Sequence, residues 1–442
     1  MSINERLFPS IYYSLFKEEN MYLLKRYKKA GLIVLGFSLF LCFACLLTVT
    51  QQQTQSGSLQ KSEAAPPKNP LTAAVPEEAP PLTLTFAGDL MAHTVNFNMD
   101  DYNAIYEDVK IVLQTDDLSF VNVETPVCDD LPMATYPQFN VHTPYLRAAF
   151  QAGFDVFSFA NNHTNDKNAA GIDGTLKAIQ TLQDELAQPE AANRIFAHSG
   201  LKQTADEPFH VTHINYKGWN ILFCSITELL NSYDSSKNRL YYSPSTKEGR
   251  KLLLEFLAQA RKEHPCDLFV LSLHLNEPEY VRTVSEEKKA WFKQLGEAGI
   301  DIIWAHHPHV MQPWEFIHVD RPSDSDGGSP NEQPAAKAVF CMYSMGNFIS
   351  GQRWNVRYDD PAFYREYTGD AVLLQLQCQK QAGNLSMSVT PLLITQYNAL
   401  PNPVVKQFTP EWIQTLTTKE QTYFNQRFTL MHDYLPFDAA HE

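Results

Sequence analysis

Short apolar runs in this chain repeatedly end in a side chain that can bind a metal ion or move a proton. The runs lie at 82–87, 119–123, 154–159, 268–273, 300–305 and 339–343. Helical patterns separate several of them, with apolar side chains three and four positions apart, as at 253–260. Strands that alternate with helices predict an α/β fold built on a mainly parallel sheet. Because the carboxyl ends of parallel strands meet at one edge of a sheet, the polar groups that follow them should gather there.

The polar groups at these strand ends are of the types that suit Mn²⁺, Zn²⁺ or Fe, namely carboxylates, amide oxygens and imidazoles. Each also has a plainer interpretation. Asp89 after Gly88 fits a turn, Glu124 fits a solvated strand end, Asn162 fits a helix cap, and His274 fits a hydrogen-bonded core histidine. Their recurrence at successive strand ends is what favours a metal site.

Three histidines end the run at 300–305. His307 and His309 are two residues apart, so in an extended chain their side chains would share one face, whereas His306 would point away. Two neutral imidazoles on one face suit a single metal centre. The alternative is a polar loop whose histidines hydrogen-bond locally.

Composition limits the partners of this chain. A formal net charge of −15 and a pI near 5.4 argue against binding to nucleic acid. The seven cysteines are dispersed and form no CxxC pair, which favours buried thiols over a disulfide framework. No Walker-type glycine loop is visible, so the usual nucleotide-binding folds are disfavoured.

The N-terminal region predicts attachment to the cell membrane. A basic cluster precedes an uncharged apolar run that is long enough to cross a bilayer as a helix, with the basic side in the cytoplasm. A retained single-pass anchor, a signal peptide and a lipoprotein signal at Cys45 are all compatible with this pattern. The expected parts are 1–29, a basic cytoplasmic terminus; 30–50, a transmembrane anchor or signal helix; 51–81, a flexible Pro-, Gln- and Ser-rich linker; 82–400, an extracytoplasmic globular domain; and 401–442, a C-terminal helical extension.

Taken together, the strand-end motifs resemble the CapA (PgsA) family of poly-γ-glutamate capsule biosynthesis, a branch of the calcineurin-like metallophosphoesterase superfamily. The resemblance covers 82–400 and implies an α/β domain folded as a four-layer α/β/β/α sandwich of the metallophosphoesterase type. It also implies two divalent metal ions, Mn, Zn or Fe. The motifs that carry it are Gly88-Asp89, Asn122-Val123-Glu124, Asn161-Asn162-His163 with Asp166, His274, His307-Pro308-His309 and Ser344-Met345-Gly346-Asn347-Phe348.

The resemblance implies a role for each matching residue. The metal ligands would be Asp89, Glu124, Asn162, His274, His307 and His309. His163 would face the leaving group as an acid, and Asp166, Asn122 and Asn347 would support the ligands. The chain departs from the family pattern at two places. Leu275-Asn276 stands where Trp-Gly usually follows the middle histidine, and Ala305 replaces a glycine before the histidine cluster.

Two classes of function fit these observations. The first is a membrane-anchored, extracytoplasmic metal-dependent hydrolase that acts on a phosphoester or on an anionic envelope polymer. The second is an accessory subunit that binds polymer without cleaving it, beside the membrane subunits of a capsule synthase. A surface protein with a metal-free site is a third, weaker alternative.

Overall fold

The computed structural model describes residues 79–186, 194–321, 335–381, 384–399 and 402–437. The expected cytoplasmic terminus and membrane segment, together with nearly all of the expected linker, lie outside the described residues. Within the part that is described, no helix is both long and apolar enough to cross a membrane.

The first sheet is mixed, and its strands follow the order β14-β13-β12-β1-β2-β3-β4, with β11 paired to β1 off this path. The strands from β1 to β4 run parallel, whereas β12, β13 and β14 pair antiparallel along the other half. Their bounds are β1 Leu82–Leu90, β2 Leu118–Val123, β3 Phe154–Ser158, β4 Ala197–Ser199, β11 Asn347–Ile349, β12 Asp370–Gln381, β13 Asn384–Ala399 and β14 Asn402–Gln407.

The second sheet is also mixed and has the order β5-β6-β7-β8-β10-β9. Its central strands β6, β7, β8 and β10 run parallel, and an antiparallel strand lies at each edge. Its bounds are β5 Thr212–Tyr216, β6 Trp219–Thr227, β7 Leu268–His274, β8 Ile302–His306, β9 Met311–Arg321 and β10 Ala335–Met345. The prediction of an α/β fold is confirmed. The parallel strands form one half of the first sheet and the centre of the second, and antiparallel strands complete both sheets.

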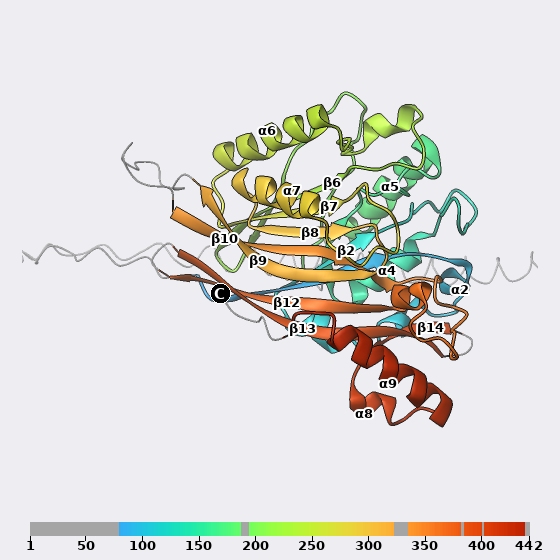
Figure 1. Ribbon diagram of the computed structural model, residues 1–442. Helices are drawn as coiled ribbons and strands as arrows, with labels where there is room; N and C mark the ends of the chain where they lie inside the picture. The colour runs from blue at the N-terminus through green and yellow to red at the C-terminus, as the bar shows by residue number, and fades with distance from the viewer. Residues whose placement is uncertain (1–78, 187–193, 322–334, 382–383, 400–401, 438–442) are drawn as a thin grey trace, which may run out of the picture. The chain divides into compact units, whose positions relative to one another are not determined.

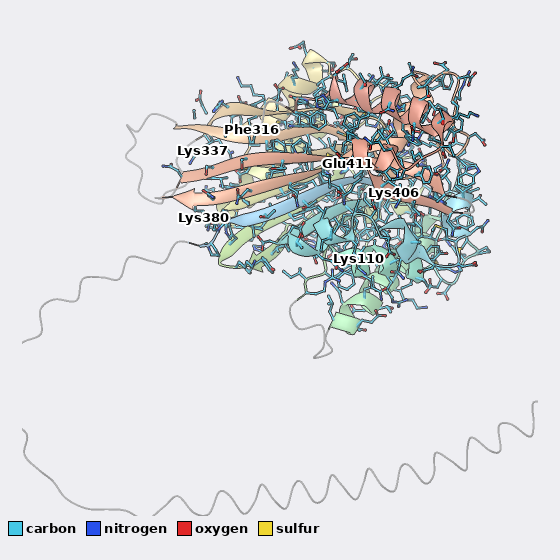
Figure 2. The ribbon with its side chains drawn as sticks, turned by 90° about the horizontal axis from the view of Figure 1, so that it is seen from below. Lys110, Phe316, Lys337, Lys380, Lys406 and Glu411 are labelled. Carbon is cyan, nitrogen blue, oxygen red and sulfur yellow. The ribbon has the colours of Figure 1, made fainter. Side chains whose placement is uncertain are left out.

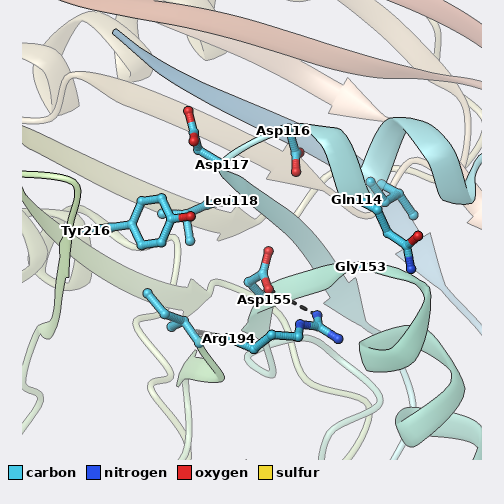
Figure 3. A pocket seen from close by; sticks show the side chains of 10 residues that line it. Gln114, Asp116, Asp117, Leu118, Gly153, Asp155, Arg194 and Tyr216 are labelled. Atoms are coloured by element: carbon cyan, nitrogen blue, oxygen red, sulfur yellow. Dashed lines mark hydrogen bonds and ion pairs between the residues drawn. The ribbon is translucent and has the colours of Figure 1, made fainter. Parts of the chain in front are cut away.

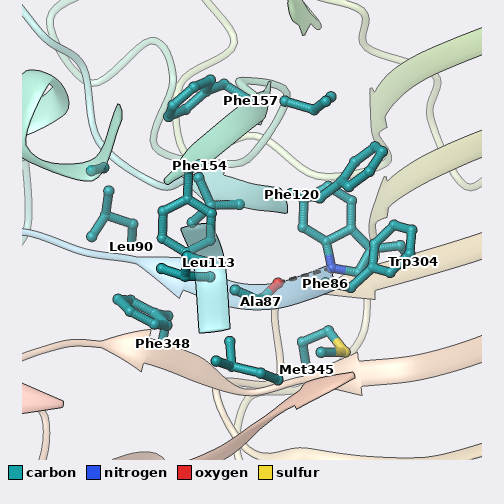
Figure 4. Close-up of a cluster of buried hydrophobic side chains, with 14 of the residues drawn as sticks. Phe86, Ala87, Leu90, Leu113, Phe120, Phe154, Phe157, Trp304, Met345 and Phe348 are labelled. Atoms are coloured by element: carbon teal, nitrogen blue, oxygen red, sulfur yellow. Dashed lines mark hydrogen bonds between the residues drawn. The ribbon is translucent and has the colours of Figure 1, made fainter. Parts of the chain in front are cut away.

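The two sheets pack face to face through large aromatic side chains. Trp304 of β8 lies edge-on to Phe86 and Phe120 of the first sheet, with ring centroids 5.7 and 6.0 Å apart. Its indole Nε1 donates a hydrogen bond of 2.9 Å to the carbonyl of Ala87 (Figure 4). This bond satisfies the buried indole and connects β8 to β1 one residue before Gly88. The strand ends that carry the candidate ligands are therefore held together across the sandwich.

Helices cover the outer faces of the sheets. The apolar faces of α6 and α7 form one core with the second sheet, above which they lie in Figure 1. Those of α4, α5 and α9 belong to the core of the first sheet. The α-helices are α2 Thr94–Phe97, α3 Lys110–Thr115, α4 Thr143–Ala152, α5 Asn168–Leu186, α6 Lys247–Glu263, α7 Glu286–Glu297, α8 Pro410–Ile413 and α9 Thr418–His432, and the 3₁₀ helices are η1 Tyr102–Ile105, η3 Ser235–Arg239 and η4 Tyr364–Gly369.

The C-terminal segment does more than add helices. Its strand β14 pairs antiparallel with β13 and carries Lys406, which is labelled in Figure 2. The Lys406 ammonium lies 3.4 Å from the carboxylate of Asp108, in the turn before α3. Arg427 of α9 reaches inward to the buried carboxylate of Asp370, at the start of β12. The segment expected to be a helical extension thus supplies a strand to the first sheet and an anchor to its core.

Candidate metal centre

Parallel strands from both sheets end at the same place, and their last residues form the centre. Asp89 belongs to β1, and its Cα is in register with Asn122 of β2 and with Asn347 of β11. In the second sheet, His274 and His306 are in register at the ends of β7 and β8. In both sheets, therefore, the carboxyl ends of parallel strands bring polar side chains together, as the sequence predicted.

Asp89, Glu124 and His309 form the closest group. One possible ligand atom from each lies within 4.8 Å of the others, and all three side chains are buried. His309 Nδ1 is 3.5 Å from Asp89 Oδ2, and its Nε2 is 3.8 Å from Glu124 Oε1. His274 Nε2 lies 3.8 Å from the same oxygen of Glu124. These distances leave room for a cation between the donors, which suits shared coordination better than direct hydrogen bonding.

His306 lies inside the centre, and the prediction that it points away is wrong. Its Nδ1 is 3.0 Å from Asp89 Oδ1, and its ring stacks at 6.4 Å from that of His274. The alternation argument failed because β8 ends at His306. The chain then turns, with positive φ of 104° at His307 and 58° at His309. His307 consequently reaches the group from another direction, with its ring 5.1 Å from His274 and 5.9 Å from His309.

Unpaired buried polar atoms are concentrated in this centre. Among the described residues, nine such side-chain atoms belong to only six residues. They are Oδ2 of Asp89, both carboxylate oxygens of Glu124, Oδ1 of Asn162, both ring nitrogens of His274 and of His306, and Nδ1 of His307. The Nδ1 of His306 is close to Asp89 but does not form a hydrogen bond of good geometry with it. A buried polar atom without a partner costs free energy, so native proteins keep few of them outside functional sites. A neutral imidazole has one nitrogen with a free electron pair, so His274 and His306 can each offer one donor atom to a metal. The carboxylate oxygens, the amide oxygen and the imidazole of His307 add further donors, and the residues present therefore fit a bound cation.

Burial also sets the protonation of these groups. It raises the pKa of Glu124 well above its usual value, and the neighbouring charge of Asp89 raises it further. Burial opposes ionisation of Asp89 as well, but contacts with His306 and His309 hold its pKa well below the usual value. Burial lowers the pKa of His274 well below its usual value and that of His307 to about 3. The imidazoles of His274 and His307 are therefore neutral near pH 7, which is the form that binds metals.

Three asparagines orient the groups around the centre. Asn122 donates a 2.8 Å hydrogen bond to Asp89 Oδ1, and Asn161 donates to the carbonyl of Val123 at 2.8 Å. The side-chain oxygen of Asn347 lies 3.0 Å from His309 Nδ1. Asn122 and Asn347 thus each contact a candidate metal ligand, and such partners fix the orientation of a ligand.

His163 faces a separate part of the site. Its Nδ1 lies 2.7 Å from Asp166 Oδ2, and the same carboxylate oxygen accepts the backbone N–H of Phe139 at 2.8 Å. Asn162 donates to Asn231 Oδ1 at 3.2 Å, which leaves its own side-chain oxygen unpaired. Asn231 also contacts the His163 ring, and sequence reasoning missed it because it lies in a loop after β6 with no motif around it.

Gly88 allows β1 to approach the loop before β11. A Cβ atom built there would lie 2.0 Å from the carbonyl oxygen of Gly346, which accepts the backbone N–H of Asp89 at 3.0 Å. Only glycine permits this approach. The glycines of the Gly88-Asp89 and Ser344-Met345-Gly346-Asn347-Phe348 motifs therefore hold Asp89 and Asn347 side by side.

A cavity of about 490 Å³ opens beside the centre. His163 and His309 both line it, so a ligand in the cavity would lie against both side chains. Another pocket, of about 280 Å³, lies at the amino ends of β2 and β3, at the opposite end of the parallel strands (Figure 3). Asp116, Asp117 and Asp155 line it, and Arg194 pairs with Asp155.

The fold and the site define a mixed α/β protein with a buried carboxylate and imidazole centre where the strands of two packed sheets end. Residues 83–352, more than half of the chain, match the model of the family described as "Bacterial capsule synthesis protein PGA_cap". The chain belongs to this CapA family of capsule biosynthesis proteins, as the resemblance of its motifs predicted.

Two curated relatives carry the name CapA. The chain is 25% identical over 418 residues to the "Capsule biosynthesis protein CapA" of Bacillus anthracis, covering 92% of this chain and 86% of that protein. It is 22% identical over 335 residues to the "PGA biosynthesis protein CapA" of Bacillus subtilis strain 168, covering 74% of each.

Two solved structures also align with the chain. A hypothetical protein from Thermus thermophilus is 14% identical, with a TM-score of 0.36, over 71% of this chain and 98% of that one. A structure of PhoD is 10% identical, with a TM-score of 0.33, over 75% of this chain and 69% of that one.

Proposed function

We propose that this protein is a metal-dependent hydrolase of capsule biosynthesis, with a metallophosphoesterase-type sandwich that binds two divalent ions. Its substrate would be a phosphoester or an anionic envelope polymer such as poly-γ-glutamate. The observation that carries the proposal is the concentration of nine buried polar atoms without hydrogen-bond partners on six residues, each of which can offer a ligand atom. A bound cation would coordinate these atoms and so offset the free-energy cost of burying them without partners.

The residues divide into two tasks. Asp89, Glu124, Asn162 and the four histidines His274, His306, His307 and His309 would hold Mn, Zn or Fe. The bound ions would supply an activated water and neutralise the charge of the substrate.

His163 would carry the proton. Its ring is fixed through Nδ1 by Asp166, so Nε2 is the nitrogen left to act on a ligand in the cavity that His163 lines. From there it would protonate the departing oxygen. Asn231, against the same ring, would limit its rotation.

The cellular setting comes from the sequence and the relatives. The uncharged run at 30–50 supports a domain held outside the cytoplasm, by a single membrane span or a lipid. The names of the two relatives support a role in capsule or PGA biosynthesis. Its partners there would be the membrane subunits of a capsule synthase, which a domain tethered to the membrane could reach.

Elemental analysis and turnover would test the proposal. The full chain, purified with and without added Mn²⁺, should contain divalent metal in the first preparation and should hydrolyse either an aryl phosphodiester or poly-γ-glutamate. Protein that takes up no metal, or that turns over neither substrate with Mn²⁺, Zn²⁺ or Fe²⁺, would contradict it.

One observation favours the second candidate, a polymer-binding subunit without hydrolytic activity. The cavity beside the centre is also lined by the exposed residues Arg357 and Arg365, which suit a long anionic ligand. The His163→Ala variant separates the two. Capsule display that survives this change but is lost in Asp89→Asn would indicate binding, whereas loss in both would indicate hydrolysis.

A further inference from the structure

The cavity beside the centre has a cationic wall that the proposed hydrolysis does not use. Arg357 and Arg365 line it, as His163 and His309 do. Neither guanidinium forms an ion pair with any carboxylate of the described residues, although the chain has a net charge of −15. Eight other described arginines each pair with an aspartate or a glutamate. The two guanidinium groups at the cavity are therefore free to pair with an anionic ligand.

Aromatic rings hold both arginines in place. The Arg357 guanidinium lies 4.1 Å from the ring centroid of Phe363, and that of Arg365 lies 5.2 Å from the ring of Tyr280. Arg365 also donates a 3.1 Å hydrogen bond to the hydroxyl of Tyr280. A guanidinium that packs on a ring keeps its N–H edge free for a planar oxyanion.

The arginines are also fixed relative to the centre. The backbone N–H of Tyr280 donates to the carbonyl of Pro308 at 2.8 Å, within the histidine loop. Arg365 lies on η4, which the buried Arg353 anchors through the carbonyls of Glu366 and Gly369. The cationic wall and the metal ligands are thus parts of one connected structure, which is what positioning of a substrate requires.

We propose that Arg357 and Arg365 form a subsite for the carboxylates of a γ-glutamyl chain, next to the bond that the centre acts on. The inference rests on the proposed function, because it names the substrate class of the same site. A small phosphoester would need only the centre. Two separate cations that line the same cavity suit a ligand with repeated anionic groups, and a guanidinium edge matches a carboxylate with two hydrogen bonds.

Glu279 gives the subsite an opposing charge. This exposed carboxylate lines the same cavity, beside Tyr280. It would repel a chain of carboxylates, so its removal should strengthen the binding that the arginines provide. The cavity therefore contains residues whose substitutions should change affinity in opposite directions.

Calorimetric titration of the full chain, kept metal-free with a chelator, would test the subsite. The probes are a short oligo-γ-glutamate, the same oligomer with its carboxylates amidated, and a poly(glycerol phosphate). Wild-type protein should bind the γ-glutamyl oligomer more tightly than the other two. Arg357→Gln and Arg365→Gln should each weaken that binding about tenfold, and Glu279→Gln should tighten it about threefold. Lys293→Gln, which removes an exposed cation of α7, should bind as the wild type does.

The subsite is refuted if both arginine variants bind the oligomer like the wild type, or if the amidated oligomer or poly(glycerol phosphate) binds as tightly. Metal uptake, measured on a part of each preparation that is incubated with Mn²⁺ instead of the chelator, separates this result from the proposed function. Metal uptake by the wild type with no arginine effect would overturn the subsite alone. Arginine effects in a protein that never takes up metal would support the subsite and overturn the hydrolase.

Discussion

His163 Nδ1 lies 2.7 Å from a carboxylate oxygen of Asp166, and both side chains are buried in the loop after β3. Because Asp166 also accepts the backbone N–H of Phe139, its carboxylate is itself fixed. A histidine oriented through one nitrogen presents the other in a defined direction, and here that direction is the cavity that His163 lines.

The pair gives the first prediction. If turnover is observed, His163→Ala should lower kcat by about 10²–10⁴-fold, and Asp166→Asn by about 10–100-fold, with little change in metal content. Asp173→Asn, an exposed change on α5, is the matched control for Asp166→Asn. Steady-state kinetics and elemental analysis on the same samples would check this. Loss of metal in His163→Ala would show that His163 is a ligand rather than an acid.

The second prediction concerns Glu124, whose two oxygens lack hydrogen-bond partners in the described structure. In the absence of metal, Glu124→Gln should be at least as stable as the wild type, because it removes a buried group that resists ionisation. With Mn²⁺ the order should reverse, since only the wild type gains stability from binding. Thermal unfolding with and without Mn²⁺ would measure both effects, with the exposed Glu185→Gln as control. Equal stabilisation of Glu124→Gln by Mn²⁺ would exclude Glu124 as a ligand.

The sequence predicted the site region well, because strand ends and their polar residues depend on local pattern. Asp89, Glu124 and His274 lie where that pattern placed them, and Glu124 and His309 come within 3.8 Å of each other across the two sheets. The order of the strands and the antiparallel edges could not be obtained in the same way. They depend on which runs pair, and β12 joins β1 across nearly 290 residues of chain.

Two details of the site escaped the sequence for physical reasons. The alternation that excluded His306 holds only within a strand, and β8 ends at His306, three residues before His309. Arg357 and Arg365 lie outside regular strands, and only their packing on Phe363 and Tyr280 makes them part of a cavity wall. Such contacts depend on the tertiary fold and leave no spacing signal in the chain.

The position of His306 gives the third prediction. His306→Asn should lower metal affinity at least tenfold, as His309→Asn should, because both imidazoles lie within 3.5 Å of a carboxylate oxygen of Asp89. His432→Asn, at the end of α9, is the control and should keep wild-type affinity. Competition with a fluorescent chelator would give the affinities. Wild-type metal affinity in His306→Asn would show that His306 is not a ligand, and would leave His307 and His309 as the ligands from this segment.

The fourth prediction concerns the buried ion pairs at the start of β12. Asp370 contacts both Arg353 and Arg427 within 2.5 Å, and all three side chains are inaccessible to solvent. Asp370→Asn should therefore lower the free energy of unfolding by about 3–5 kcal/mol, because it leaves two buried cations without a counter-charge. Asp130→Asn, which breaks an exposed pair with Lys177, should cost less than about 1 kcal/mol. Urea denaturation would measure both, and similar costs would contradict the structural role of Asp370.

The last prediction tests the electrostatics of the pocket at the amino ends of β2 and β3. Burial raises the pKa of Asp116 from 3.8 to about 7, although a hydrogen bond from Ser119 and one from Thr85 oppose the shift. In the window between these two values the folded state keeps a proton that the unfolded state releases. Stability contributed by Asp116 is therefore lost as the pH rises through that window.

Asp116→Asn should remove this pH dependence. The variant should match the wild type near pH 4 and exceed its free energy of unfolding by about 2 kcal/mol near pH 8, a value reduced for the partial exposure of the site. Asp117→Asn is the adjacent control. Because Asp117 pairs with Lys217 and accepts the backbone N–H of Thr83, its loss should destabilise the protein instead. A stability difference between Asp116→Asn and wild type that stays constant over this pH range would show that Asp116 is ionised in the folded protein throughout.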